Sequence, residues 1–276
     1  MNGQAIFQSL AKTRIGAGLE YGSLAVLMAM AAGPSFAAPA PTPVPAAAEA
    51  FLGVWIMPAG DDVPRQFRNT PWAPAPAQMF TPWGAVQSKA LATHVTPGDC
   101  DPWGPLVNGG SLFPIEIAKT NYGVVISYEV TVLPRRIYTD GRPHPKDLDP
   151  QWMGHSVGHW EGDTLVVDTV GTNGRARPIN GYIDGTVFST GNGAFAPRLP
   201  QSDQLHVVER YRVVGGGQFL EGQVTVEDPK SYTGKFSQTR YWERRPDLEF
   251  QEYYCTDNVR RDEEGQNTPA PPPAGQ

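Results

Sequence analysis

Residues 205–227 read LHVVERYRVVGGGQFLEGQVTVE, and this stretch decides the fold class. Leu205–Val214 and Gln218–Glu227 are both rich in β-branched and aromatic residues, a composition typical of strands. The glycines at 215–217 separate the two segments and supply the positive φ angles that a tight turn needs. The stretch therefore predicts a β-hairpin.

Further segments of the same composition lie on both sides of this hairpin. They are Tyr122–Glu129, Val130–Tyr138, Ser156–Trp160, Thr164–Val170, Phe236–Arg244 and Leu248–Cys255. No long segment after residue 37 has helical periodicity. About eight strands at hairpin spacing predict an all-β fold, either an antiparallel β-barrel (lipocalin-like) or a sandwich. The many prolines and tryptophans in residues 51–115 predict a wrap of loops over the sheet, anchored by tryptophan side chains.

The two ends of the chain have a different composition. Lys12 and Arg14 precede the apolar run LAVLMAMAA, and SFA at residues 35–37 has the small residues of a cleavage site, so residues 1–37 predict a signal peptide. Residues 38–50 predict an extended Pro/Ala linker, residues 51–258 a single β domain, and residues 259–276 a disordered tail. We therefore expect a bacterial protein that is periplasmic or secreted and has no stable membrane anchor.

Charge and cysteine content narrow the range of partners. The chain of 276 residues has a formal net charge of −6 and no basic run, which argues against nucleic acid as a partner. Its two cysteines, Cys100 and Cys255, are expected to form a disulfide in an oxidising compartment. We expect a small molecule as substrate or ligand, and no cofactor.

One face of the predicted strands is not cleanly apolar. Leu205, Val207, Glu209 and Tyr211 share one side of their strand, and Arg240 lies among aromatic residues on another. A purely structural barrel usually keeps one face apolar. Such residues predict either a polar and aromatic pocket, with Glu209 binding substrate, or buried ion pairs.

Histidines are concentrated in residues 135–168, RRIYTDGRPHPKDLDPQWMGHSVGHWEGDTLVVD. An imidazole titrates near physiological pH and can act as a general acid or base when a carboxylate orients it. The candidate catalytic residues are His159 and His144, with His155 and His206 as secondary candidates. The candidate substrate-binding residues beside Glu209 are Arg136, Tyr138, Trp152 and Trp160.

Two other interpretations of these histidines stay open. His144, His155 and His159 could bind a metal, but Gly154 and Gly158 disfavour the helix that would bring the last two together, and a strand would separate them by roughly 13 Å. The histidines could also be ordinary polar residues at a barrel rim.

The string WMGHSVGHWEGDTLVVDTVG, at residues 152–171, carries a resemblance. Together with RRIYTDGRPHP before it, and LHVVERYRVV, TVEDPKSYT and QEYYCTDN after it, it resembles a large group of uncharacterised secreted bacterial proteins common in soil and water. The resemblance spans about residues 98–258. It implies export and an all-β domain, and it brings no catalytic assignment.

Three functional hypotheses follow. The first is a cofactor-independent enzyme (a hydrolase, lyase or isomerase) that acts on a small aromatic, terpenoid-like or sugar-derived molecule inside the barrel through histidine acid–base chemistry. The second is a non-catalytic barrel that binds such a ligand or a protein partner. The third is a metalloenzyme centred on the histidines.

Overall fold

The computed structural model describes residues 46–58, 63–70, 73, 75–93, 102–108, 113–130, 133–176, 179–180, 198–253, 259–261 and 267–269. All of them belong to one compact unit, Pro39–Gln276. The predicted signal peptide at 1–37 and the predicted disulfide between Cys100 and Cys255 lie outside the described residues.

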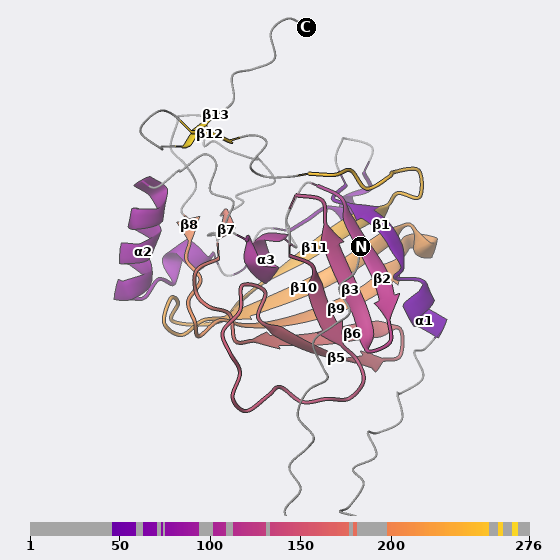
Figure 1. Ribbon diagram of the computed structural model, residues 1–276, viewed down its shortest axis with the longest axis horizontal. Helices are drawn as coiled ribbons and strands as arrows, with labels where there is room; N and C mark the ends of the chain where they lie inside the picture. The colour runs from indigo at the N-terminus through magenta and orange to yellow at the C-terminus, as the bar shows by residue number, and fades with distance from the viewer. Residues whose placement is uncertain are drawn as a thin grey trace, which may run out of the picture. The chain divides into compact units, whose positions relative to one another are not determined.

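A closed barrel of nine strands forms the body of this unit (Figure 1), in the order β1-β11-β10-β9-β6-β5-β4-β3-β2. Its strands are β1 (Gly53–Ile56), β2 (Ile115–Thr120), β3 (Gly123–Tyr128), β4 (Arg135–Tyr138), β5 (His155–Glu161), β6 (Thr164–Val170), β9 (His206–Val214), β10 (Phe219–Glu227) and β11 (Phe236–Arg244). The predicted all-β barrel is confirmed. Its strand pairs are antiparallel except for β4 and β5, which run parallel.

Short elements complete the described part of the chain. They are α1 (Ala46–Glu49), α2 (Pro82–Thr93), α3 (Gly104–Asn108), the 3-10 turns at Arg65–Phe67, Pro76–Gln78 and Gly215–Gly217, and the two-stranded sheets β7 (Ile179–Asn180) with β8 (Arg198–Leu199) and β12 (Val259–Arg261) with β13 (Asn267–Pro269). Figure 1 shows α2 beside β8 and α1 beside β2. None of the described helices is long and apolar enough to cross a bilayer.

The strand at the C-terminal end of the barrel was predicted wrongly. Residues 248–253, the described part of the predicted strand Leu248–Cys255, form no strand. The barrel closes instead through β1, which pairs with both β11 and β2. Because β11 already has β10 and β1 as neighbours, a strand following it in the sequence has no free edge to join. β1 lies in the proline-rich region 51–115 that was expected to form loops, and β2 begins at the last residue of that region.

The helix α2 also contradicts the expectation that no helix of this length would form. Pro82 stands at its first position, where a missing N–H costs nothing, and the Thr81 hydroxyl accepts the Gly84 N–H at 3.0 Å as a cap. Its apolar residues do not mark its buried face, since Ser88 is buried while Val86 is exposed. Periodicity alone could not reveal this helix.

The segment before β2 follows the barrel wall as predicted, although its first tryptophan lies in the wall itself. Trp55 is fully buried on β1, and its Nε1 donates to the Phe51 carbonyl at 2.9 Å. Where β1 ends, the backbones of Thr70 and Ala73 take over its place beside β11, with hydrogen bonds to Thr239 and Ser237. The wrap therefore continues the wall rather than only covering it.

The ends of the described region carry more regular structure than expected. Within the predicted linker, α1 places Ala48 in the core, because alanine forms helices readily and Phe51 closes the turn through its N–H to the Ala48 carbonyl. Lys119 of β2 pairs with Glu49 at 2.9 Å. Within the predicted tail, β12 pairs with β13.

Two apolar clusters occupy much of the barrel interior. One contains Trp55, Val167 and Trp242, and the other contains Val207 and Phe236. An apolar void lined by residues of the first cluster has a volume of about 20 Å³, which is room for roughly one water molecule. This void cannot accept the small organic molecule that was expected inside the barrel.

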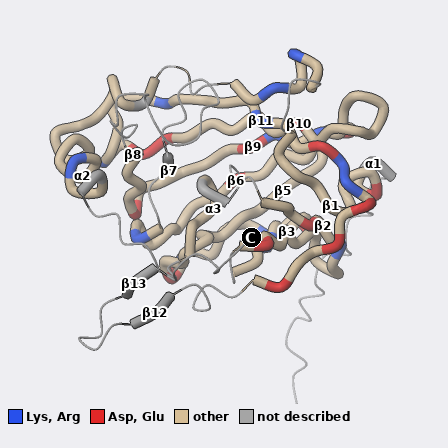
Figure 2. Tube along the Cα trace, turned by 90° about the horizontal axis from the view of Figure 1, so that it is seen from above, with Lys and Arg blue, Asp and Glu red and all other residues tan. Residues whose placement is uncertain are grey.

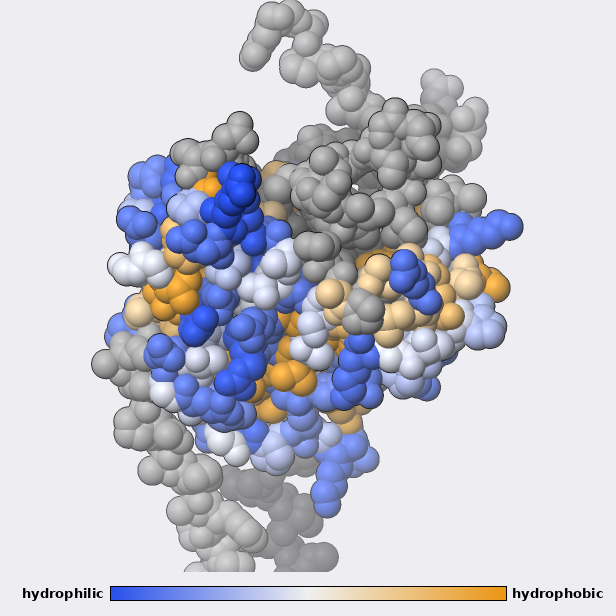
Figure 3. All heavy atoms as spheres, turned by 180° about the vertical axis from the view of Figure 1, so that it is seen from behind, coloured by the Kyte–Doolittle hydropathy of each residue, from blue (hydrophilic) through white to orange (hydrophobic). Residues whose placement is uncertain are grey.

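The outside of the described region is polar. Figure 2 shows basic and acidic residues interspersed around the wall, and ion pairs such as Arg210 with Glu161 link neighbouring strands. On the face in Figure 3, hydrophilic residues predominate and apolar patches lie between them. The large apolar side chains that are exposed among the described residues are Val86, Phe113 and Tyr253.

Candidate functional site

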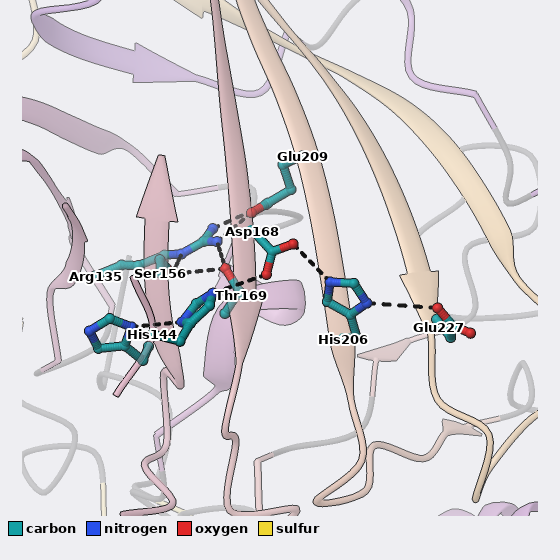
Figure 4. Close-up of polar contacts among 9 residues, drawn as sticks. Arg135, His144, Ser156, Asp168, Thr169, His206, Glu209 and Glu227 are labelled. Atoms are coloured by element: carbon teal, nitrogen blue, oxygen red, sulfur yellow. Dashed lines mark hydrogen bonds and ion pairs between the residues drawn. The ribbon is translucent and has the colours of Figure 1, made fainter. Parts of the chain in front are cut away.

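Two rows of polar side chains lie on opposite faces of the same part of the wall (Figure 4). Alternation along β6 separates them, since Thr169 is fully buried while the next residue back, Asp168, has 42% of its side chain exposed. Thr169 belongs to a row inside the barrel, and Asp168 belongs to a row on the outer face.

The inner row is a buried ion pair with its hydrogen-bond partners. Arg135 of β4 binds Glu209 of β9 through both terminal nitrogens, with Nη1–Oε1 at 3.0 Å. Arg135 also donates to Ser156 at 3.2 Å and Thr169 at 2.8 Å, and the Tyr211 hydroxyl donates to Glu209 at 2.7 Å. Burial opposes the charged form of Arg135, but the attraction of Glu209 outweighs it and raises the pKa.

This row distinguishes between the two interpretations of the mixed strand face, a polar and aromatic pocket or buried ion pairs. Glu209 is only 1% exposed, and both of its oxygens are engaged inside the barrel. The polar residues of the interior thus form a buried ion pair rather than the lining of an open pocket. Glu209, a candidate for substrate binding, lies in that pair.

The outer row is a chain of histidines and carboxylates that crosses four strands. His144 Nε2 lies 3.1 Å from Asp168 Oδ1, and His206 Nε2 lies 3.0 Å from Asp168 Oδ2. On the far side of His206, its Nδ1 is 3.7 Å from Glu227 Oε2, which Lys235 holds at 2.8 Å. On the far side of His144, its Nδ1 faces His155 Nδ1 at 2.9 Å.

His144 reaches this row because β4 and β5 are parallel. A parallel pair needs a long return connection, here residues 139–154, and this connection carries His144. It is anchored against the end of β6 by the Gln151 N–H to the Gly171 carbonyl at 3.0 Å. Leu148 packs directly against Gly171, so that a Cβ at position 171 would lie only 2.1 Å from Leu148 Cδ2. Gly171 also has φ +72°. Only glycine permits this close approach.

The chain of contacts fixes the tautomers of two histidines. A carboxylate accepts hydrogen bonds, so neutral His144 carries its proton on Nε2, facing Asp168. Its Nδ1 then has a lone pair and accepts from Nδ1–H of His155. This arrangement leaves Nε2 of His155 with a lone pair and with no hydrogen-bond partner among the described residues. Partial burial, and then repulsion by His144 when that imidazole is protonated and by the charge of Arg142, lower the pKa of His155.

His155 is therefore a neutral base at pH 7 with an oriented partner behind it. A proton taken by Nε2 is balanced through His144 by the negative charge of Asp168. Catalytic triads have the same two properties: the base is held in one tautomer, and the cation that it forms is stabilised by a carboxylate.

Aromatic and cationic groups surround the base. The Tyr138 ring stacks on His155 with centroids 5.2 Å apart and 22° between the planes, and Tyr122 lies 5.0 Å from Tyr138. The Arg142 guanidinium lies over the Tyr138 ring, 4.1 Å from its centroid. Tyr138 was a candidate for substrate binding, and it lies against the base.

The other candidate residues lie elsewhere. His159 is 66% exposed and pairs with Glu161, two residues away on the same face of β5, at 3.1 Å; it has no hydrogen bond with His144. Arg136 is exposed on the outer face of β4. Trp160 packs on Phe51 with centroids 5.0 Å apart.

Trp152 contacts the guanidinium of Arg175 at 5.0 Å, apart from the histidine row. The metal hypothesis required His144, His155 and His159 to meet. Within the described ranges, no group of three or more His, Cys, Asp or Glu side chains is arranged to hold a metal ion.

Sequence reasoning missed Asp168, the centre of the row, and Arg142. Asp168 interrupts the apolar strand LVVDTV at an outward position, and a lone carboxylate there was the available signal. Arg142 is two residues from His144 in the loop DGRPHP.

Comparison with known proteins brings no match: no family model fits the chain, and no curated protein or solved structure is significantly similar to it. The fold and the site define a closed β-barrel with a histidine–carboxylate chain on its outer face. Any function must be argued from this geometry.

Proposed function

We propose that the protein is an exported enzyme, a hydrolase, lyase or isomerase, in which His155 acts as general base on a small molecule bound at the outer face of the barrel. The observation that carries the proposal is the chain Asp168–His144–His155, which leaves one imidazole nitrogen free and keeps it neutral. The proposal involves no cofactor.

The chemistry follows from the order of the groups. Nε2 of His155 takes a proton from the substrate or from a water that attacks it, and His155 becomes a cation. Nδ1–H of His155 hydrogen-bonds His144, and Asp168 stabilises the positive charge at the other end of that imidazole. The protonated His155 then returns the proton to the leaving group or to another atom of the substrate, so no net proton is consumed.

His155 is a stronger candidate than His159, although the two are equally prominent in the sequence. His159 is mostly exposed, and its nearest carboxylate, Glu161, is also engaged by Arg210 at 2.7 Å. Solvent keeps such a pair weakly coupled. His155 is half-buried and has both an orienting partner and an aromatic wall.

The test is substrate consumption by the purified full-length protein and two variants. Each is incubated with a small-molecule extract of bacterial growth medium and followed by untargeted mass spectrometry. We expect the parent to consume at least one compound, His155→Ala to lose about 10²–10⁴-fold in rate, and the matched variant His159→Ala to keep it. Equal losses in both variants, or no loss in His155→Ala, would refute the role of His155.

A non-catalytic barrel that binds a protein partner is the second candidate, and the packed interior favours it. The void among the described residues of the interior, about 20 Å³, is too small for a carried ligand, so this candidate places binding on the outer surface. In the same experiment, no consumption by the parent together with capture of a partner protein from periplasmic extract favours this candidate.

A further inference from the structure

The loop that carries His144 also holds a cation in a fixed position. Arg142 Nε lies 2.9 Å from both oxygens of Asp140, and Nη2 binds the same carboxylate. The hydrogen bonds with Asp140 raise the pKa of Arg142 and lower that of Asp140. Gly141 between them has φ +84°, a conformation that glycine adopts without strain. The guanidinium is thus oriented before any ligand arrives.

One edge of this guanidinium remains free. Asp140 takes the edge formed by Nε and Nη2, and no described residue binds Nη1. The adjacent edge, formed by Nη1 and the second hydrogen of Nη2, presents two parallel N–H groups. This geometry matches the two oxygens of a carboxylate or phosphate.

The free edge belongs to the same site as the base. Tyr138 is contacted by the guanidinium of Arg142 at 4.1 Å and by the imidazole of His155 at 5.2 Å. After burial and the charge of a protonated His144, the charge of Arg142 also lowers the pKa of His155.

The remaining charges near this ring favour an anion. Asp140 is neutralised by Arg142, and Asp168 is held by two histidines. Arg136, on the outer face of β4, and Lys146, two residues beyond His144, are both exposed. Asp140 and Asp168 are therefore paired, while Arg136 and Lys146 are available to attract a negative ligand; Asp147 and Asp149, further along the same loop, are exposed and have no ion pair among the described residues.

We infer that Arg142 binds an oxyanion of the substrate, so that the site takes a small molecule with a carboxylate or phosphate group close to the atom that His155 deprotonates. The position of the anionic group, close to the atom that His155 deprotonates, rests on the proposed function. Binding of the anion itself requires no turnover, so it can be tested separately.

The experiment uses NMR of the full chain with ¹⁵N-labelled histidine. Acetate and inorganic phosphate are titrated in turn, at constant ionic strength against sodium chloride, and the imidazole signals of His155 report binding. We expect a saturable shift for at least one of the two anions. Arg142→Gln should weaken that binding at least tenfold. The matched control Arg210→Gln, which removes an arginine from the same outer wall, should leave it within twofold.

Two results would overturn the inference. One is a shift that does not saturate or that chloride reproduces, because this would be ionic screening only. The other is binding that survives in Arg142→Gln, provided that thermal unfolding shows this variant to be folded.

The inference and the proposed function fail in different ways. Anion binding that depends on Arg142, without any consumed compound, supports the inference and contradicts the enzyme. Consumption that depends on His155 with a KM unchanged in Arg142→Gln contradicts the inference and leaves the enzyme.

Discussion

The buried ion pair inside the barrel gives the sharpest test of the fold. The side chains of Arg135 and Glu209 are 1% and 2% exposed, so Glu209→Gln would leave a guanidinium buried without a counterion. Removing one partner of such a pair costs about 3–5 kcal/mol. Glutamine keeps the volume and can still accept from the Tyr211 hydroxyl, so we assign nearly all of this cost to the lost charge.

Urea unfolding at pH 7, followed by tryptophan fluorescence, measures this cost. A matched control is Glu161→Gln, which breaks an exposed ion pair on the outside of the same wall and should leave stability unchanged within error. The triple variant Arg135→Met/Glu209→Leu/Tyr211→Phe removes the pair together with its hydroxyl partner, and should recover most of the loss. A cost below about 1 kcal/mol for Glu209→Gln would refute the interpretation of a charged buried pair.

Three further predictions concern single residues. Because burial and nearby positive charge lower the pKa of His155, its NMR titration should have a midpoint below 6.5, and the stability that this neutral imidazole contributes should be lost as pH falls through that midpoint; a midpoint above 6.5 would contradict the site. His206 holds Asp168 Oδ2, so His206→Ala should lower kcat about tenfold, or ~1.4 kcal/mol, with KM unchanged in steady-state assays of the compound identified by mass spectrometry, whereas a change in KM alone would indicate substrate contact. Burial raises the pKa of Tyr128 to about 12, so the folded state keeps a proton that the unfolded state releases above pH 10; this tyrosine should lower the free energy of unfolding by about 2 kcal/mol between pH 10 and 12, and the fall should be smaller by that amount in Tyr128→Phe.

Strand composition predicted most of the barrel because each strand carries its own signal. Thr164–Val170 and Phe236–Arg244 have in the structure the bounds expected from the sequence. The alternation of Leu205, Val207 and Tyr211 on one face is also confirmed, since all three are buried. Period-two patterns depend only on neighbouring residues, and this makes them readable without tertiary information.

The short strand β1 could not be predicted from strand composition and alternation. Its four residues Gly53–Ile56 are too few to show a clear alternation and stand just before the prolines at 58 and 64, but they close the barrel by pairing with β2 and β11. The predicted strand after β11 has the better composition and forms no strand in its described residues. Pairing depends on which edge is free, and this is a property of the whole sheet.

The candidate site also combines features that the sequence determined with features that only the tertiary structure decided. The sequence by itself determined that histidines, arginines and aromatic residues are concentrated in residues 135–168, and that His159 and Glu161 share a strand face. Only the tertiary structure decided that His144 meets His155 and Asp168, because the parallel pairing of β4 and β5 carries the connecting loop along the wall. It also decided that Arg135 faces inward while Arg136 faces outward, since alternation assigns opposite faces but only closure of the barrel determines which face is the inside.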